Sequence, residues 1–260
     1  MMPRRFLSPT VWESAGPADD TARLLVTRFL DAVSVPPQRA AWAQVASVDG
    51  APWLAALRAR AVALRAKRWL DVTLSLALLA VTAPVLLAAA LLVRLSGPGP
   101  ALFVQKRIGY RGQSFDMYKL RTMVPEAHLL EDELATRSSG KTFLKLERDP
   151  RITRIGRLLR RTSLDELPQL LNVLSGDMSL VGPRPLLRCD FAKFPKDQQL
   201  RRFAMPPGLT GLWQVSGRSL LSDEDRIRLD LDYVDQWSLL FDLEVLLRTV
   251  PAVLSGRGAS

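Results

Sequence analysis

Two adjacent carboxylates, Asp165 and Glu166, are the side chains best suited to chemistry in this sequence. Further along the chain, Pro183 and Pro185 flank Arg184. A carboxylate can act as a nucleophile, and two carboxylates can hold Mg²⁺ together with the phosphate oxygens of a substrate. An arginine fork binds phosphate oxygens in pairs, and the two prolines restrict the backbone that carries it. These residues predict chemistry on a phosphorylated substrate.

A structural explanation of the same carboxylates is also open. Ser163 followed three residues later by Glu166 matches a capping box, which predicts that a helix begins here. Carboxylates in the first turn of a helix are favoured by its dipole without any chemistry. The same field would attract a phosphate and keep Asp165 ionised as a nucleophile. Capping alone and capping with catalysis both fit the pattern, and Gly176 is well placed to end the helix.

Cationic side chains accompany the carboxylate pair. Residues 148–161 hold six arginines in 14 positions, and apolar residues mark the opposite face of the helix that they predict. Guanidinium groups pair with phosphate oxygens and keep their charge in any environment. This face therefore fits either phosphate binding or a surface that meets solvent or lipid headgroups. The cations that we assign to a substrate phosphate on charge alone are Lys119, Arg121 and Arg151.

Composition narrows the range of chemistry. The 260 residues carry 36 Lys and Arg against 26 Asp and Glu, a formal charge of +10, which predicts an anionic partner such as nucleic acid, a phosphorylated substrate or acidic lipid. One cysteine, Cys189, and one histidine, His128, exclude an internal disulfide and a multi-histidine metal site within this chain. A hydrophobic share of 48% predicts a folded core.

One segment predicts a membrane helix. The 22 residues from Val72 to Val93 carry no charge, and as a helix they would reach roughly 33 Å, enough to cross a hydrocarbon core of about 30 Å. Pro84 lies near the middle and removes a backbone hydrogen bond, so the helix can instead break, enter one leaflet and return. Cations flank both ends, which favours two ends on one side of the membrane. A buried core helix is a third alternative.

The remaining chain predicts the elements around these residues. Residues 1–66 form an extension, 67–95 the membrane helix, and 96–258 a domain with short strands and interfacial C-terminal helices. The elements expected in that domain are strands at 101–105 and 115–120, a helix at 125–136 and amphipathic helices from 222 to 247. Trp237 and the stretch 239–254 favour an interfacial location for the last of these.

Nine motifs follow one another as they do in the bacterial sugar transferase family, the monotopic phosphoglycosyl transferases. They are Lys67-Arg68-x-x-Asp71, the central Pro84, Gln105-x-Arg107-x-Gly109, Tyr118-Lys119-x-Arg121-Thr122-Met123, Asp149-Pro150-Arg151, Ser163 to Gln169, Gly176 to Pro185, Pro207-Gly208-x-Thr210-Gly211 and Trp213-Gln214-Val215-Ser216-Gly217-Arg218. Each motif alone is weak, but nine in register make the resemblance specific, and it covers about residues 67 to 258.

The resemblance implies a fold and a location. The fold would be α/β and mostly helical, with a re-entrant helix hairpin broken at Pro84 and a small catalytic domain on the cytoplasmic face of the bacterial inner membrane. Arg68 and Asp71 would lie at the membrane break and the lipid headgroups. One departure is that Ala83 precedes Pro84 where many members have a small hydroxyl residue, and Thr82 is the substitute that this chain offers.

The resemblance also implies a reaction. A sugar 1-phosphate, with galactose or glucose as the expected sugar, would pass from a UDP-sugar to polyprenyl phosphate with the help of Mg²⁺. Asp165 would be the nucleophile, releasing UMP and forming an aspartyl intermediate. Glu166 would hold the metal with Asp165 or act as acid and base. Arg184 would line the nucleotide site with Pro183 and Pro185.

A rival hypothesis is a non-enzymatic, basic, membrane-anchored protein that binds acidic lipid or nucleic acid. An acidic pair between an arginine helix and a stiff arginine loop argues against nucleic acid, because such a binder gains nothing from carboxylates inside its basic surface. We therefore expect a UDP-sugar, polyprenyl phosphate and membrane lipids as partners, and no nucleic acid. The sequence leaves open the transferred sugar, the pathway, the role of residues 1–66 and whether the protein forms a homo-oligomer.

Overall fold

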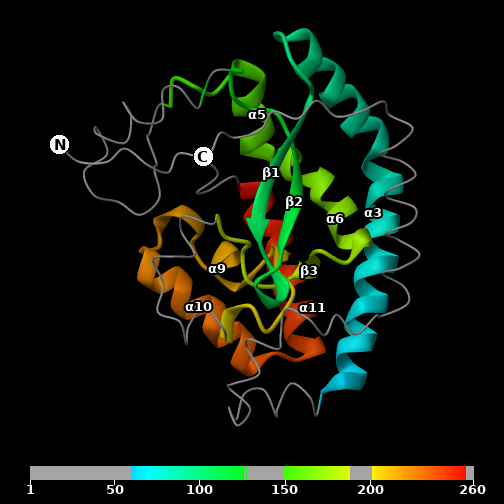
Figure 1. The fold of residues 1–260 in the computed structure, drawn as a ribbon, viewed down its shortest axis with the longest axis vertical. Coiled ribbons are helices and arrows are strands. Elements are labelled where there is room, and N and C mark those ends of the chain that lie inside the picture. The colour runs from blue at the N-terminus through cyan, green and yellow to red at the C-terminus, as the bar shows by residue number, and fades with distance from the viewer. Residues whose placement is uncertain (1–59, 126, 128–148, 188–200, 256–260) are drawn as a thin grey trace, which may run out of the picture.

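The computed structural model of the protein describes residues 60–125, 127, 149–187 and 201–255. Most of the predicted extension and most of the predicted helix at 125–136 lie outside this part, as do His128 and Cys189. Within it, helices predominate over two small two-stranded sheets, which confirms a mostly helical α/β class. Figure 1 shows one long helix along one side of a compact set of short elements.

The long helix is α3 (Ala61–Leu95), which has 35 residues and contains Pro84. The prediction that the helix breaks at Pro84 is wrong, because α3 continues through this residue. One proline removes one backbone hydrogen bond, and the bonds on either side keep the rest of the helix intact, so a bend is the expected result. Figure 1 shows α3 changing direction in its upper half. The Thr82 hydroxyl donates to the carbonyl oxygen of Leu78 at 2.6 Å.

One face of α3 packs on the rest of the protein, most deeply near the two ends of the helix. Near its beginning Lys67, Asp71 and Ser75 are buried, and near its end Ala89 and Val93 pack in a cluster with residues of β2 and α5. The opposite face exposes large apolar side chains. Among them are Trp69, Leu70, Leu74, Leu78, Val81, Val85, Leu87, Leu91 and Leu92. Among the described residues, α3 is the one helix long and apolar enough to cross a membrane.

A β-hairpin follows α3, as the sequence predicts. Strands β1 (Leu102–Ile108) and β2 (Ser114–Leu120) pair antiparallel, with Leu102 opposite Leu120. The 3₁₀ turn η2 (Tyr110–Gly112) connects them. The first strand runs three residues beyond the predicted end at 105, because these residues continue the pairing with β2 as far as Ser114. Ile108 also bridges to Leu186 in the loop after β3. The second sheet pairs β3 (Ser179–Val181) parallel to β4 (Gly208–Thr210).

The segment with the carboxylates forms three successive helical elements. They are α5 (Arg154–Thr162), the 3₁₀ helix η4 (Leu164–Gln169) and α6 (Leu170–Ser175). Gly176 ends α6 with a φ of 88°, as predicted, because glycine enters the left-handed region without steric cost. The C-terminal part adds α9 (Leu212–Val215), η5 (Arg218–Leu220), α10 (Asp223–Gln236) and α11 (Leu239–Ser255).

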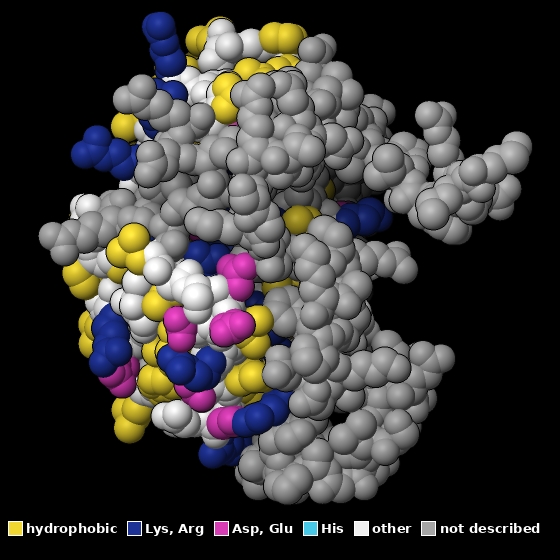
Figure 2. All heavy atoms as spheres, turned by 90° about the vertical axis from the view of Figure 1, so that its left-hand side faces the viewer, with side chains coloured by type: hydrophobic (Ala, Val, Ile, Leu, Met, Phe, Trp, Pro, Cys, Tyr) yellow, Lys and Arg dark blue, Asp and Glu magenta, His cyan; other side chains and the backbone are white. Residues whose placement is uncertain are grey.

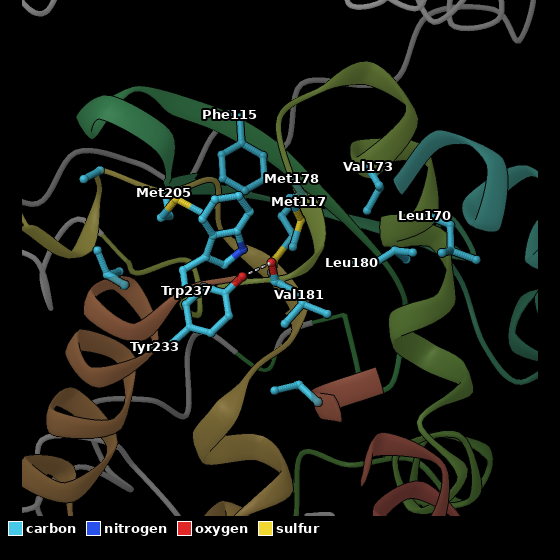
Figure 3. Close-up of a cluster of buried hydrophobic side chains, with 13 residues drawn as sticks. Phe115, Met117, Leu170, Val173, Met178, Leu180, Val181, Met205, Tyr233 and Trp237 are labelled. Atoms are coloured by element: carbon cyan, nitrogen blue, oxygen red, sulfur yellow. Dashed lines mark hydrogen bonds between the residues drawn. The ribbon is translucent and has the colours of Figure 1, made fainter. Parts of the chain in front are cut away.

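The main hydrophobic core lies between the hairpin, α6, β3 and the C-terminal helices. Figure 3 shows Trp237 and Tyr233 packed beside Phe115 and Met205, with the Tyr233 hydroxyl bonded to the Val181 carbonyl oxygen at 3.0 Å. Trp237 is 1% exposed. Its predicted role as an interfacial anchor is therefore wrong, because the indole is needed in the core, where its Nε1 donates to the carboxylate of Asp242 at 3.1 Å.

Candidate active site

The carboxylate pair lies at a sharp change of direction between α5 and η4. Ser163 joins the two with a φ of 57°, and the amide of Glu166 donates to the Ser163 carbonyl oxygen at 3.2 Å. The predicted capping box is wrong, because the Ser163 hydroxyl makes no capping bond and the Glu166 carboxylate has other partners. The side-chain cap in this segment is Thr153, whose hydroxyl accepts from the Gly156 amide at the start of α5.

Asp165 is a buried carboxylate, with 7% of its surface exposed. Burial raises its pKa, and the neighbouring charge of Glu166 raises it further. Lys119 and Arg160 act in the opposite direction and favour the ionised form. The result is a poorly solvated carboxylate with cations near it, an environment that suits a nucleophile directed at an anionic substrate.

Glu166 pairs with two cations. Its Oε1 lies 2.8 Å from Lys119 Nζ and 3.2 Å from Arg184 Nη2. Burial alone would raise the pKa of Glu166, but Lys119 and Arg184 outweigh it and hold this pKa well below its usual range. The pKa values of the two adjacent carboxylates are thus driven in opposite directions, that of Asp165 upward and that of Glu166 downward.

Arg184 extends the site toward the C-terminal elements. Its guanidinium carbon lies 5.6 Å from the centre of the Trp213 ring, and that of Arg226 lies 5.3 Å from the same ring. An indole next to two guanidinium groups is stabilised by cation–π attraction. The predicted loop arginine, Glu166 and Lys119 therefore lie together, beside an aromatic surface that the sequence did not indicate.

Arg160 is a further site residue that the sequence analysis missed. Its Nε donates to Thr122 Oγ1 at 2.9 Å, and its charge acts on Asp165, Asp149 and Glu166. Arg154 and Arg157, two other arginines of the same segment, are exposed. The signal that could have identified Arg160 as a site residue was its position in the sequence, five residues before Asp165 and across one turn of chain.

Two predicted phosphate ligands are engaged elsewhere. Arg121 donates to the carbonyl oxygens of Val93 and Gly97, each at 3.0 Å, and to that of Pro98, so it holds the end of α3. Arg151 forms a two-pronged pair with the Asp149 carboxylate, the closest contact being 2.7 Å. Both assignments rested on charge alone, and both guanidinium groups are used to join segments of the fold.

The three residues predicted at the membrane break and headgroups lie on α3. Pro84 is inside the helix, with its surface exposed. Arg68 donates to the carbonyl oxygens of Val173 and Leu174, and Asp71 is 6% exposed and accepts from the Leu180 amide at 2.9 Å. Arg68 and Asp71 thus fasten α3 to α6 and β3, and a headgroup contact of Arg68 stays a prediction.

The carboxylate pair is also the place where a metal ion could bind. Among the described residues, no three His, Cys, Asp or Glu side chains gather as a metal site. Mg²⁺ often binds through one or two carboxylates and completes its shell with substrate phosphate oxygens and water. Both cations contact the same oxygen of Glu166, Oε1. Asp165 and Glu166 fit a metal ion that a phosphorylated substrate helps to hold.

Comparisons with known proteins show the family of this chain. The family described as bacterial sugar transferase matches residues 62–256.

The galactosyl transferase CpsE of Streptococcus agalactiae is 44% identical over 197 residues, which are 75% of this chain and 43% of CpsE. The exopolysaccharide production protein ExoY of Sinorhizobium fredii is 40% identical over 198 residues, 74% of this chain and 87% of ExoY. A Caulobacter vibrioides protein, named UDP-glucose:undecaprenyl-phosphate glucose-1-phosphate transferase, is 47% identical over 197 residues, 73% of this chain and 70% of that protein. The chain therefore spans less than half of CpsE but most of the other two.

Proposed function

This chain belongs to the bacterial sugar transferase family, and from that premise we propose that it transfers a sugar 1-phosphate from a UDP-sugar to polyprenyl phosphate. The observation that carries the proposal is the buried Asp165 beside an ionised Glu166, with Lys119, Arg160 and Arg184 around them. The names of the relatives support a galactose or glucose donor and a polyprenyl phosphate acceptor.

The reaction would proceed in two displacements at phosphorus. A carboxylate oxygen of Asp165 attacks the phosphorus that bears the sugar, the bond to the bridging oxygen breaks, and UMP leaves with the electron pair. The product is a phosphosugar joined to Asp165 as an acyl phosphate. An oxygen of polyprenyl phosphate then attacks the same phosphorus, which frees Asp165 and gives polyprenyl-diphosphate-sugar. Splitting one displacement into two predicts ping-pong kinetics.

The surrounding charges have separate tasks in this reaction. Burial leaves Asp165 poorly hydrated, so less water has to be removed before attack. Arg160 and Lys119 offset the repulsion between this carboxylate and the diphosphate of the donor. Glu166 holds Lys119 and Arg184 in place, with contacts of 2.8 Å and 3.2 Å. Fixed cations of this kind need no reorganisation when negative charge develops during transfer.

We include Mg²⁺ in the proposal, held by Asp165 and Glu166 together with donor phosphate oxygens. When bound, the ion would neutralise charge on the diphosphate and on the departing UMP. Removal of divalent cations with a chelator is the test, with UMP release measured before and after Mg²⁺ is restored. Release that continues unchanged in excess chelator would remove the metal from the proposal.

We propose that α3 enters the membrane from the cytoplasmic face and returns to it. Both ends of the helix are held by the same small domain: Lys67 and Arg68 contact β3 and α6, while Arg121 binds Val93 at the other end. A straight 35-residue helix would extend about 52 Å, so a spanning orientation would require this polar domain to lie beside it in the bilayer. The bend near Pro84 and the exposed apolar face support shallow entry into one leaflet.

The last helix supports the same membrane location. Its exposed apolar residues recur at intervals of three and four, so they form one stripe along α11. They are Leu240, Leu243, Leu247, Val250 and Leu254, each more than half exposed. A helix with such a stripe lies at an interface between lipid and water. Together with α3, this stripe supports attachment to a membrane, and the location that we propose is the cytoplasmic face of the bacterial inner membrane.

The rival hypothesis, a basic lipid-binding protein without activity, makes a different prediction about covalent chemistry. Purified protein is incubated with UDP-glucose or UDP-galactose in detergent, without polyprenyl phosphate, and its peptides are examined by mass spectrometry. We expect a hexose-phosphate adduct on the peptide that contains Asp165, together with released UMP. UMP release with polyprenyl phosphate but no adduct would favour direct transfer, and neither product with a panel of UDP-sugars would favour the rival hypothesis.

A further inference from the structure

The backbone of Arg184 is held by a buried ion pair that lies behind the site. Arg202 Nη2 donates to the carbonyl oxygen of Arg184 at 2.9 Å and lies 2.5 Å from Asp230 Oδ2. The carbonyl of Arg184 therefore meets the cation of this pair, and Asp230 in turn holds that cation.

The ion pair supports the middle of the loop, whereas backbone hydrogen bonds hold the loop on either side. Pro183 and Pro185 have no amide hydrogen, so Arg184 carries the one N–H of this tripeptide. On either side the loop is already fixed: the Gly208 amide donates to the Pro183 carbonyl at 2.9 Å, and the Leu186 carbonyl accepts from the Ile108 amide at 2.8 Å. Between these two points, Arg202 holds the carbonyl oxygen of Arg184, and Asp230 pairs with Arg202.

The pair is deeply buried, at 1% side-chain exposure for Asp230 and 7% for Arg202. Among the described residues, the carboxylate oxygens of Asp230 have no hydrogen-bond partner, so the contact with Arg202 is chiefly electrostatic. Burial raises the pKa of Asp230 to about 6, against the opposing charges of Arg202 and Arg184. A buried pair of this kind contributes little to stability compared with apolar packing, which suggests that its use lies in the backbone it holds.

We propose that Asp230 and Arg202 are positioning residues, which fix the Arg184 peptide so that its guanidinium stays between Glu166 and Trp213. Neither side chain is placed in contact with Glu166, so their effect on transfer passes through Arg184. The inference rests on the proposed function for its effect on rate. Its structural part, the immobilisation of the Arg184 backbone, is independent of the reaction.

Hydrogen–deuterium exchange tests the structural part on the full chain in detergent. In Asp230→Asn we expect the peptide covering residues 182–186 to exchange faster, while peptides from β1 and β2 keep their rates. The double variant Asp230→Asn/Arg202→Gln removes both charges and so leaves no unpaired buried ion, which guards against simple misfolding. Unchanged exchange at residues 182–186 in both variants would overturn the proposal, whether or not the protein transfers a sugar.

A neighbouring ion pair provides a matched control. Arg201 and Asp235 join the same two segments, but they lie at the surface, with Arg201 Nε 2.8 Å from Asp235 Oδ1. Acidic and basic side chains are interspersed on the face of the molecule seen in Figure 2, toward which α10 lies. Asp235→Asn should therefore leave both exchange at residues 182–186 and the rate of UMP release unchanged.

The kinetic test uses a double-mutant cycle with Arg184→Ala. We expect Asp230→Asn to lower kcat/KM for UMP release roughly tenfold in the wild-type background. In the Arg184→Ala background the same substitution should change the rate less than about twofold, because residues that act through one group are not additive. If Asp230→Asn lowers kcat/KM equally in both backgrounds, and the variants have equal melting temperatures, Asp230 does not act through Arg184 and the proposal is overturned. Wild-type protein that releases no UMP would refute the proposed function and leave the exchange result to decide the structural part.

Discussion

At the scale of single residues, two adjacent carboxylates differ because their surroundings differ. Asp165 is buried next to a like charge, and Glu166 receives two cations on one oxygen. Since Glu166 is already committed to Lys119 and Arg184, the nucleophile in our proposal is Asp165. We expect Asp165→Asn to lower UMP release by about 10⁴-fold or more, as removal of a covalent catalyst does. Asp235→Asn, on the surface of α10, should keep the wild-type rate, and an active Asp165→Asn enzyme would refute the assignment.

The pH dependence of the reaction follows from the same two environments. A nucleophilic carboxylate must be ionised, so the rate falls as the pH drops through the raised pKa of Asp165. Lys119 opposes that rise. Lys119→Met should therefore raise the pKa of Asp165 further and move the acid limb of kcat/KM to higher pH. The control is Lys106→Met, an exposed lysine on the same hairpin, which should leave the limb in place. A limb that stays fixed in Lys119→Met would mean that Asp165 does not govern it.

At the scale of elements, local signals predicted regular structure well. Short apolar segments located both strands of the hairpin, although the first strand ends three residues later than predicted, and Gly176 marked the end of α6. Pro84 and Ser163 were misjudged for a common reason: each matches a local rule that the surrounding structure overrides. Pro84 is accommodated within a helix packed along one face, and the Glu166 carboxylate turns from its own backbone to Lys119, 47 positions earlier in the chain.

The residues of the site show the same limit of local signals. The sequence identified Asp165, Glu166, Lys119 and Arg184, which the structure brings together. Arg121 was assigned to phosphate, yet the carbonyl oxygens after α3 hold its guanidinium. Long-range partners decide which cation faces the site and which one joins segments of the fold. Asp230 could not be found for this reason, since its link to Arg184 crosses from α10 to the loop after β3.

The attachment of α3 to α11 gives a prediction at this scale. Lys67 Nζ lies 2.7 Å from Asp242 Oδ2, and both side chains are less than a tenth exposed. Lys67→Met would leave a buried carboxylate without its cation, so we expect a loss of about 3–5 kcal/mol in unfolding free energy. Lys67→Met/Asp242→Asn should recover part of that loss. Arg248→Ala, which breaks the exposed pair with Glu244, should cost at most about 1 kcal/mol, as measured by thermal unfolding in detergent.

If Lys67→Met were no more damaging than Arg248→Ala, the first turns of α3 would not depend on this ion pair. The Tyr233 hydroxyl, which donates to Asp242 Oδ1 at 2.7 Å, and the Trp237 indole would then suffice to hold the carboxylate. That outcome would make α11, rather than the cation on α3, the element that organises the junction.

At the scale of the whole molecule, the path of α3 decides which side of the membrane each part occupies. The domain holds both ends of the helix, so we expect both to be reached from the cytoplasm. Single cysteines at Val62 and Lys106, exposed positions before and after the apolar stretch, can be introduced into a Cys189→Ser chain. A membrane-impermeant maleimide should label both in inverted membrane vesicles and neither in intact spheroplasts. UMP release by the unlabelled variants shows that they are folded. Labelling of the two positions from opposite sides would establish a spanning helix, and the domain contacts at both ends of α3 would then have to be broken in the membrane.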